Sequence, residues 1–353
     1  MILVFAGAGA SAAVNPEQYP TTTEFFSRVP SEIRKSPWFR EASLFLKSVD
    51  NDSRIDIEKV LGTLAEMRDY CTKSSDTTAF PGWVLQPGQN RFSRLAETSE
   101  GELIDYDPFA SLNDILESMK KTVRSLDELE DDINRLVYEL YAARPNHEAL
   151  ETWVNLLQFL HRHDLHTEVF TTNYDLVLED AILAGGLSES IGTGRVTDGV
   201  NSTIDLDKWH STSEEIVPTF SGPGLLTKLH GSVDWQRGSD GRIIVGSSRF
   251  TGEHQNHILI YPGFKGEPQD EPFSSFHNRL RLVAERATAA IFIGYAFRDE
   301  FINEVLSDIR PKITKFVINK EQTAPSLDFL SGSAHFEEGF TEDSVQAFKR
   351  LLV

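Results

Sequence analysis

The chain opens with a short apolar run that is followed by small residues. Residues 2–6, Ile-Leu-Val-Phe-Ala, are uninterrupted, and Gly7-Ala8-Gly9-Ala10-Ser11 follows directly. A short apolar run bounded by glycine is typical of a strand buried on both faces, and small residues permit a tight turn into a helix. The pattern therefore predicts a parallel strand at 2–6 that leads into a helix.

Four later segments have the same character. They are short apolar runs bounded by a turn or by Gly, Asn or Pro, at 168–172, 257–261, 289–293 and 315–318. These runs predict further strands of a parallel sheet. Residues 234–245 differ, because two short stretches flank the turn sequence Gly-Ser-Asp-Gly at 238–241, which predicts a β-hairpin.

The middle of the chain has helical periodicity instead. Apolar residues recur at intervals of three or four along 57–67, 126–140 and 150–160, which predicts three helices. Proline and glycine predict a long loop at 80–100, and the Gly-, Ser- and Thr-rich stretch 187–224 predicts an irregular excursion, either a lid or an ordinary surface loop. We therefore predict an α/β fold. Residues 1–30 and 166–353 form a Rossmann-like parallel sheet with helices on both faces, and residues 31–165 form an α-helical insertion.

Charge and cysteine content exclude several classes of protein. The 353 residues carry 34 Lys and Arg against 54 Asp and Glu, a formal charge of −20, which argues against direct binding of nucleic acid by bulk charge. The single cysteine, Cys71, excludes an internal disulfide and a zinc site of several thiolates. Because no stretch reaches the roughly 18 apolar residues of a membrane span and no signal peptide is evident, we expect a cytoplasmic protein that does not bind membranes.

Candidate chemistry follows the predicted strands. The turn at 7–11 could hold a pyrophosphate at the start of a helix, or it could be an ordinary strand-to-helix turn. Thr171-Thr172-Asn173-Tyr174-Asp175 ends the next strand, where open parallel sheets bind ligands, although an Asx turn or a helix cap, by Asp175 in particular, is the more ordinary interpretation of this segment alone. His230, in Lys-Leu-His-Gly-Ser at 228–232, is placed to act as a general base. Two further turns, at 294–299 and 319–321, are weak indications of a ribose or adenine contact.

Taken in this order, the segments resemble the Sir2 (sirtuin-like) family. The corresponding family motifs are a Gly-Ala-Gly-x-Ser phosphate turn, Thr-x-Asn-x-Asp, Leu-His-Gly, a later Gly-rich turn and a final Asn-x-Glu; here they stand at 7–11, 171–175, 229–231, 294–297 and 319–321. Sirtuin deacylases usually carry a four-cysteine zinc module, which this chain lacks, so no zinc is expected. The motifs as they stand in this chain are Thr-Thr-Asn-Tyr-Asp at 171–175, Leu-His-Gly-Ser-Val-Asp-Trp at 229–235 and Ile-Gly-Tyr-x-Phe-x-Asp at 293–299. In these forms they resemble the bacterial Sir2-like branch that is found in antiphage defence systems.

The resemblance implies an activity and a set of roles. Members of that branch hydrolyse NAD+ to nicotinamide and ADP-ribose, which depletes the infected cell of NAD. By this resemblance Asn173 would hold the ribose or orient the attacking water, and His230 would be the base. The cofactor-binding residues implied are Gly7, Ala8, Gly9, Ser11, Thr171, Asp175, Gly294, Tyr295, Phe297 and Asn319, with Asp175 at the nicotinamide carboxamide.

Partners and alternative functions also come from the resemblance. Members of the branch act as homo-oligomers or with a second protein, such as a HerA-like ATPase or a short Argonaute, so we expect an assembly of this kind. Two other functions stay open at this point. One is an NAD-dependent protein deacylase, and the other is a non-catalytic module that binds NAD or ADP-ribose and regulates a partner.

Overall fold

The computed structural model describes residues 1–49, 57–76, 112–163, 165–187, 195–197, 202–204, 226–246, 257–259, 268, 270–320 and 327–352. The chain divides into two compact units. The first, the sheet unit, comprises residues 1–21 and 137–353, and the second, the helical unit, comprises residues 22–136.

A six-stranded sheet organises the sheet unit. Its strand order is β11-β10-β9-β1-β2-β5, and every pair of neighbours is parallel. The strands are β1 (Ile2–Ala6), β2 (Thr167–Thr171), β5 (Leu226–Lys228), β9 (Ala289–Ile293), β10 (Thr314–Ile318) and β11 (Ala334–Phe336). The predicted α/β fold with a Rossmann-like parallel sheet is confirmed.

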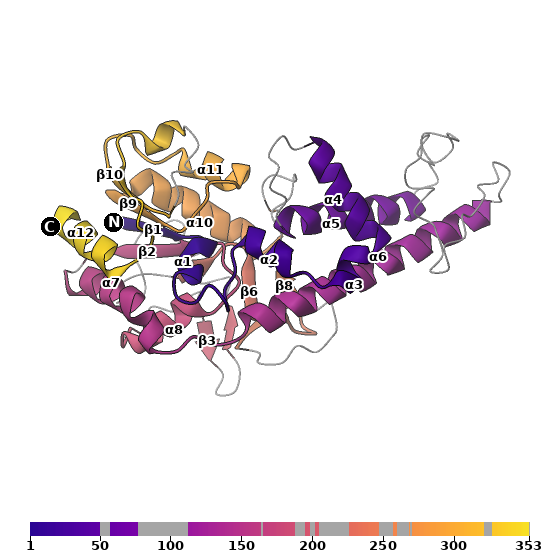
Figure 1. Cartoon of the computed structure of the whole chain (residues 1–353), viewed down its shortest axis with the longest axis horizontal. Coiled ribbons are helices and arrows are strands. Elements are labelled where there is room, and N and C mark those ends of the chain that lie inside the picture. The colour runs from indigo at the N-terminus through magenta and orange to yellow at the C-terminus, as the bar shows by residue number, and fades with distance from the viewer. Residues whose placement is uncertain are drawn as a thin grey trace. The chain divides into compact units, whose positions relative to one another are not determined.

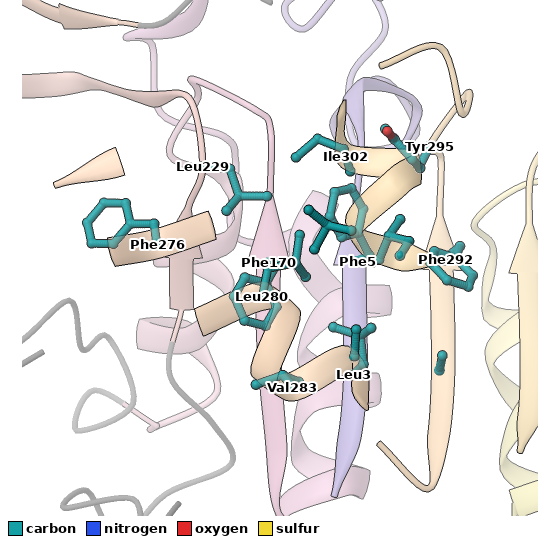
Figure 2. Packing of buried hydrophobic residues seen from close by; sticks show 14 of the residues in the cluster. Leu3, Phe5, Phe170, Leu229, Phe276, Leu280, Val283, Phe292, Tyr295 and Ile302 are labelled. Atoms are coloured by element: carbon teal, nitrogen blue, oxygen red, sulfur yellow. The ribbon is translucent and has the colours of Figure 1, made fainter. Parts of the chain in front are cut away.

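Helices cover both faces of this sheet (Figure 1). Leu3 and Phe5 of β1 belong to a buried cluster with α10 (Phe273–Arg286) and α11 (Glu300–Leu306), as Figure 2 shows. On the opposite face, Phe316 of β10 meets Phe348 of α12 (Glu342–Leu352) at a centroid distance of 4.9 Å. The alternation of buried side chains along each strand therefore supplies apolar contacts to both helix layers.

A second, antiparallel sheet lies in the same unit. Its order is β3-β4-β7-β6-β8, with β3 (Arg195–Thr197), β4 (Ser202–Ile204), β6 (Gly231–Arg237), β7 (Ile243–Val245) and β8 (His257–Leu259). Trp235 of β6 packs edge-on against Phe276 of α10, 5.9 Å between centroids, so α10 is shared by both sheets. The predicted hairpin is confirmed as β6 and β7.

Two sequence predictions need correction here. The run at 257–261 was expected in the parallel sheet, but β8 pairs antiparallel with β6. A short apolar run carries no information about its partner, which is why the direction was wrong. The stretch 187–224, which is also the candidate lid, was expected to be irregular, but it contains β3 and β4. Apart from these strands, its residues from 188 on lie outside the described part of the chain.

The helical unit contains α2 (Thr22–Arg28), α3 (Ser31–Lys35), α4 (Pro37–Val49), α5 (Ile57–Asp76) and most of α6 (Leu112–Tyr141). The buried apolar residues of α5 and α6 follow the predicted spacing, with Val60, Leu64, Leu129 and Ile133 all at most 5% exposed. Arg68 of α5 forms an ion pair with Glu130 of α6. The predicted loop at 80–100 lies outside the described residues.

The boundaries of the two units differ from the expected ones. They fall at 21/22 and 136/137 rather than at 30/31 and 165/166. At the later boundary the reason is α7 (Glu151–Arg162), whose Trp153 packs against Phe340 at 4.5 Å between centroids and which therefore belongs to the sheet unit. Among the described helices, none has both the length and the apolar character required to cross a membrane.

Candidate active site at the carboxyl edge of the parallel sheet

The residues predicted from the sequence gather at one edge of the parallel sheet. The glycine turn follows β1, Thr171 ends β2 and precedes Asn173 and Asp175, and His230 follows β5. Gly294, Tyr295 and Phe297 follow β9, and Asn319 follows β10. Because all six strands run the same way, these residues share the edge where open α/β sheets bind ligands.

The glycine turn is packed tightly against the turn after β9. The N–H of Gly9 donates to the carbonyl oxygen of Gly294 over 2.9 Å. A Cβ at Gly9 would lie 2.9 Å from Gly294 Cα, and one at Gly7 would lie 2.7 Å from Gly294 O. Gly294 itself has φ +60°, in the left-handed region. These glycines are therefore required by the approach of two backbones, whatever else the turn binds; Ala8 begins the short helix α1 (Ala8–Ala12) beside them.

Asn173 is joined to the glycine turn by its side-chain amide. Its Nδ2 donates to Gly7 O over 2.9 Å and to Ser11 Oγ over 2.8 Å. Its own backbone N–H donates to Thr171 Oγ1, which in turn donates to Ala6 O. Since both amide hydrogens are used within the protein, the group that Asn173 offers to a ligand is the acceptor Oδ1.

Asp175 belongs to the same hydrogen-bond network, because Ser11 bonds to its carboxylate. It is 4% exposed and accepts hydrogen bonds from Ser11 and from the backbone N–H of Val177, the first residue of α8 (Val177–Ala184). Burial raises the pKa of Asp175, while the Lys228 ammonium and these two donors oppose the rise. Asp175 therefore forms an Asx turn before α8, whose N-cap is Leu176, and any contact with a ligand would be additional to that turn.

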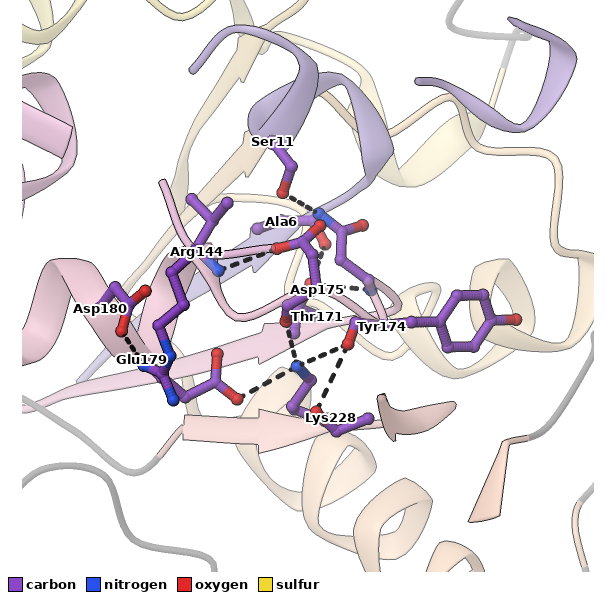
Figure 3. A network of polar contacts seen from close by, with 12 residues as sticks. Ala6, Ser11, Arg144, Thr171, Tyr174, Asp175, Glu179, Asp180 and Lys228 are labelled. Carbon is purple, nitrogen blue, oxygen red and sulfur yellow. Dashed lines mark hydrogen bonds and ion pairs between the residues drawn. The ribbon is translucent and has the colours of Figure 1, made fainter. Parts of the chain in front are cut away.

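A buried lysine holds the 173–175 loop from the next strand. Lys228, at the end of β5, is 1% exposed and donates to the carbonyl oxygens of Tyr174 and Asp175 and to Glu179 Oε1 (Figure 3). Burial raises the pKa of Glu179, and the Lys228 ammonium opposes that rise. Lys228 therefore ties the exit loop of β2 to β5, and so to the strand that leads to His230.

His230 is buried beside an acidic partner. Its Nε2 lies 3.5 Å from Asp299 Oδ2, and its side chain is 4% exposed. Among the described residues, its Nδ1 has no hydrogen-bond partner. The ring of Tyr174 lies 6.4 Å away between centroids. The next residue, Gly231, has φ +88°, and a Cβ there would lie 2.0 Å from Ile258 O, so the turn after His230 requires glycine.

The turn after β9 contributes backbone atoms to this edge of the sheet, because its aromatic side chains are packed in the core. The rings of Tyr295 and Phe297 belong to the buried apolar cluster and lie 4.8 Å apart between centroids. Phe297 has φ +55°, which is unusual for a bulky residue. Asn319 donates from Nδ2 to Tyr295 O over 2.7 Å and so holds this turn against β10.

Sequence reasoning did not single out Lys228 or His277 as members of this site, and it included Asp299 only as the last residue of the turn at 294–299. Asp299 precedes a helix and has the ordinary signature of a cap, and Lys228 was quoted only as part of the histidine segment. His277 lies on α10 and has no motif around it. No local pattern in the sequence pairs these residues with partners so distant along the chain.

The comparison with protein families bears on this geometry. The sequence model described as a SIR2-like domain matches residues 167–329, from β2 to the short 3₁₀ turn at 328–330. The match supports a Sir2-like family. It includes Asn173, His230 and Asp299, and it is compatible with an NAD-related activity and with NAD binding. None of the curated proteins searched matches the chain. In the described part of the chain, no group of three or more His, Cys, Asp or Glu residues is arranged to hold a metal ion.

Proposed function

We propose that this Sir2-like chain hydrolyses NAD+ to nicotinamide and ADP-ribose. The observation that carries the proposal is the meeting of three elements at one sheet edge. They are the Gly7–Ser11 turn, the Asn173 amide bonded to that turn, and His230 on the exit loop of the neighbouring strand with an unpartnered Nδ1 among the described residues.

The reaction breaks the bond between C1′ of the ribose and the nicotinamide nitrogen. Nicotinamide leaves as a neutral molecule with the bonding electron pair, and the developing positive charge lies on the ribose. A water oxygen then bonds to C1′ and loses a proton. Such a reaction needs positioning and electrostatic stabilisation more than a strong acid.

Two side chains supply that positioning in our proposal. Asn173 Oδ1 accepts a hydrogen bond from the attacking water or from a ribose hydroxyl, because both amide hydrogens are already used. His230 Nδ1 takes the proton that the water or the hydroxyl releases. Burial of both residues strengthens these interactions, since the local dielectric is low.

The remaining contacts follow the resemblance. Backbone of the 7–11 turn would lie near the pyrophosphate, and Gly294 and Asn319 near the adenosine half. Asp175 would contact the nicotinamide carboxamide through the carboxylate lone pairs that do not accept from Ser11 or Val177. Thr171 would act indirectly, by holding Asn173 in place.

The test is chromatography of NAD+ incubated with the purified chain. We expect nicotinamide and ADP-ribose from the parent protein, and at least a ~100-fold lower rate from Asn173→Ala and from His230→Ala, the usual effect of losing a general base or positioning group. Asn278→Ala and His335→Ala serve as controls, because both residues are exposed. Thermal unfolding of each variant separates lost chemistry from lost folding.

Other outcomes would select another function. Release of acetyl groups from an acetyl-lysine peptide, dependent on NAD+, would indicate a deacylase. Tight binding of NAD+ without product would indicate a regulatory binding module. Full turnover by both site variants, with unchanged folding, would contradict the proposed roles.

The biological setting rests on the resemblance of the motifs. We propose that the activity depletes NAD during phage infection, in a homo-oligomer or together with a HerA-like ATPase or another defence protein. Incubation of the purified chain with such a partner, compared with the chain alone, tests whether the partner changes the rate of NAD+ loss.

A further inference from the structure

We propose that Asp299 is the positioning residue for His230, and that its carboxylate holds the imidazole proton on Nε2 so that Nδ1 is the basic atom. The proposal deepens the function proposed above and rests on it for its catalytic consequence. The tautomer itself can be measured without any turnover.

Each carboxylate oxygen of Asp299 has a separate role. Oδ1 accepts the backbone N–H of Ile302 over 3.0 Å and so caps α11. Oδ2 lies 3.5 Å from His230 Nε2. The cap fixes the carboxylate on a rigid helix end, and the second oxygen is thereby aimed at the imidazole. Catalytic hydrogen bonds of this length commonly shorten when substrate binds.

The identity of the two groups determines where the proton lies. An ionised carboxylate only accepts, so the nitrogen that faces it must carry the hydrogen. A neutral imidazole has one donor nitrogen and one acceptor nitrogen, so Nδ1 of His230 is left with its lone pair. Nδ1 is the buried atom that has no partner among the described residues.

The groups around His230 agree with this assignment. Asp299 faces it from the start of α11, His277 from α10, and the ring of Tyr174 from the β2–α8 loop. Burial alone would raise the pKa of Asp299, but the hydrogen bond from His230 and the N–H of Ile302 help to hold it below its ordinary value. Burial lowers the pKa of His277 to about 4. Near neutral pH His277 is therefore uncharged and does not compete with His230 for the Asp299 carboxylate as a cation would.

Helix capping is the competing explanation, and two variants separate it from positioning. Asp, Asn and Ser are all good helix caps, so Asp299→Asn and Asp299→Ser should both keep α11 and unfold near the parent temperature. In Asp299→Asn the side-chain oxygen must take the cap, which turns the amide N–H₂ towards Nε2. That N–H₂ can only donate, so the proton of His230 moves to Nδ1, the wrong tautomer. In Asp299→Ser nothing faces Nε2.

The kinetic test compares kcat and KM for NAD+ of the three proteins. We expect kcat to fall in the order Asp, Ser, Asn, with a roughly 100-fold or larger loss for Asn and little change in KM. A carboxylate that orients a catalytic histidine can be worth up to about 10⁴ in kcat. Capping alone predicts equal rates for Asn and Ser, and that result would overturn the proposal.

A second measurement does not depend on turnover. ¹⁵N–¹H spectra of histidine-labelled protein report which ring nitrogen carries the proton, and His230→Gln identifies the signals. We expect the parent to be protonated on Nε2 and Asp299→Asn on Nδ1. A parent protonated on Nδ1 refutes the proposal even if NAD+ is hydrolysed. The expected tautomers without NAD+ hydrolysis would support the geometry and reject the proposed function.

Discussion

His277 shows how one buried side chain makes stability depend on pH. It is 1% exposed, and its Nδ1 bonds Phe273 O over 2.8 Å. Burial lowers its pKa from 6.5 to about 4, with Phe273 O opposing that shift. Between these values the unfolded chain binds a proton that the folded chain does not, so the free energy of unfolding rises with pH across this window.

We expect the His277 contribution to be complete above pH 6.5 and lost as the pH falls towards 4, by up to about 3 kcal/mol. Asp175 and Glu179 act in the opposite direction, because their pKa values are raised in the folded state. The measurement is therefore a difference between the parent and His277→Asn, which keeps a donor towards Phe273 O but does not titrate.

Urea unfolding of both proteins at pH 7 and at pH 4.5 gives that difference. The parent should lose more stability than His277→Asn on acidification. Equal losses would mean that His277 does not set the acid response of this protein.

At the scale of elements, the glycine turn and the turn after β9 form one packed unit. Gly9 lies in α1, where alanine would ordinarily stabilise a helix by about 1 kcal/mol relative to glycine. Its Cβ would instead meet Gly294 Cα at 2.9 Å. The sign of the effect of Gly9→Ala therefore distinguishes a packed turn from an open one.

We expect Gly9→Ala to destabilise the protein by about 1–3 kcal/mol, the usual cost of overpacking. Gly294→Ala should be worse, because its Cβ would lie 2.0 Å from Ala10 N and its φ is +60°. Gly186→Ala is the matched control, with φ +72° and nothing within 4 Å, so it reports backbone strain alone. A stabilised Gly9→Ala protein, measured by urea unfolding, would contradict this account.

The elements were predictable to different degrees, for physical reasons. The apolar runs of β1, β9 and β10 and the helical spacing of α5, α6 and α7 identified those elements, because buried strands and amphipathic helices imprint their periods on the sequence. The three-residue strands β3, β4 and β11 were not predicted, because they have neither the longer apolar run that indicated β8 nor the turn sequence that indicated β7. The partner of β8 was wrong because pairing depends on contacts distant in the chain.

At the scale of the whole molecule, the charge of −20 predicts weak interaction with DNA. Binding by counterion release needs clustered Lys and Arg, and non-specific DNA-binding proteins reach about 10⁻⁴–10⁻⁶ M at physiological salt. We expect the purified chain to bind duplex DNA more weakly than that.

A mobility-shift titration at about 0.15 M salt, with a basic DNA-binding protein as the positive control, measures this. Retention of the chain that falls steeply with added salt would contradict the expectation and reveal a local basic surface. In that case the chain would bind DNA by itself, without a partner protein.

The sequence by itself determined the fold class, most elements of the parallel sheet and the positions of Asn173 and His230 after strand ends. It could do so because burial periodicity and strand-end motifs are local properties of the chain. The catalytic and binding roles that the motifs imply for the twelve candidate residues remain predictions, which the experiments above address.

The tertiary structure alone decided three things. It assigned α7 to the sheet unit, it showed that Gly7 and Gly9 are covered by the backbone at Gly294, and it brought Asp299 and His277 to His230. Each depends on contacts between segments far apart in the chain. A single sequence records which residues are apolar or charged, but the distance between two such residues exists only once the strands have been ordered and the helices packed upon them.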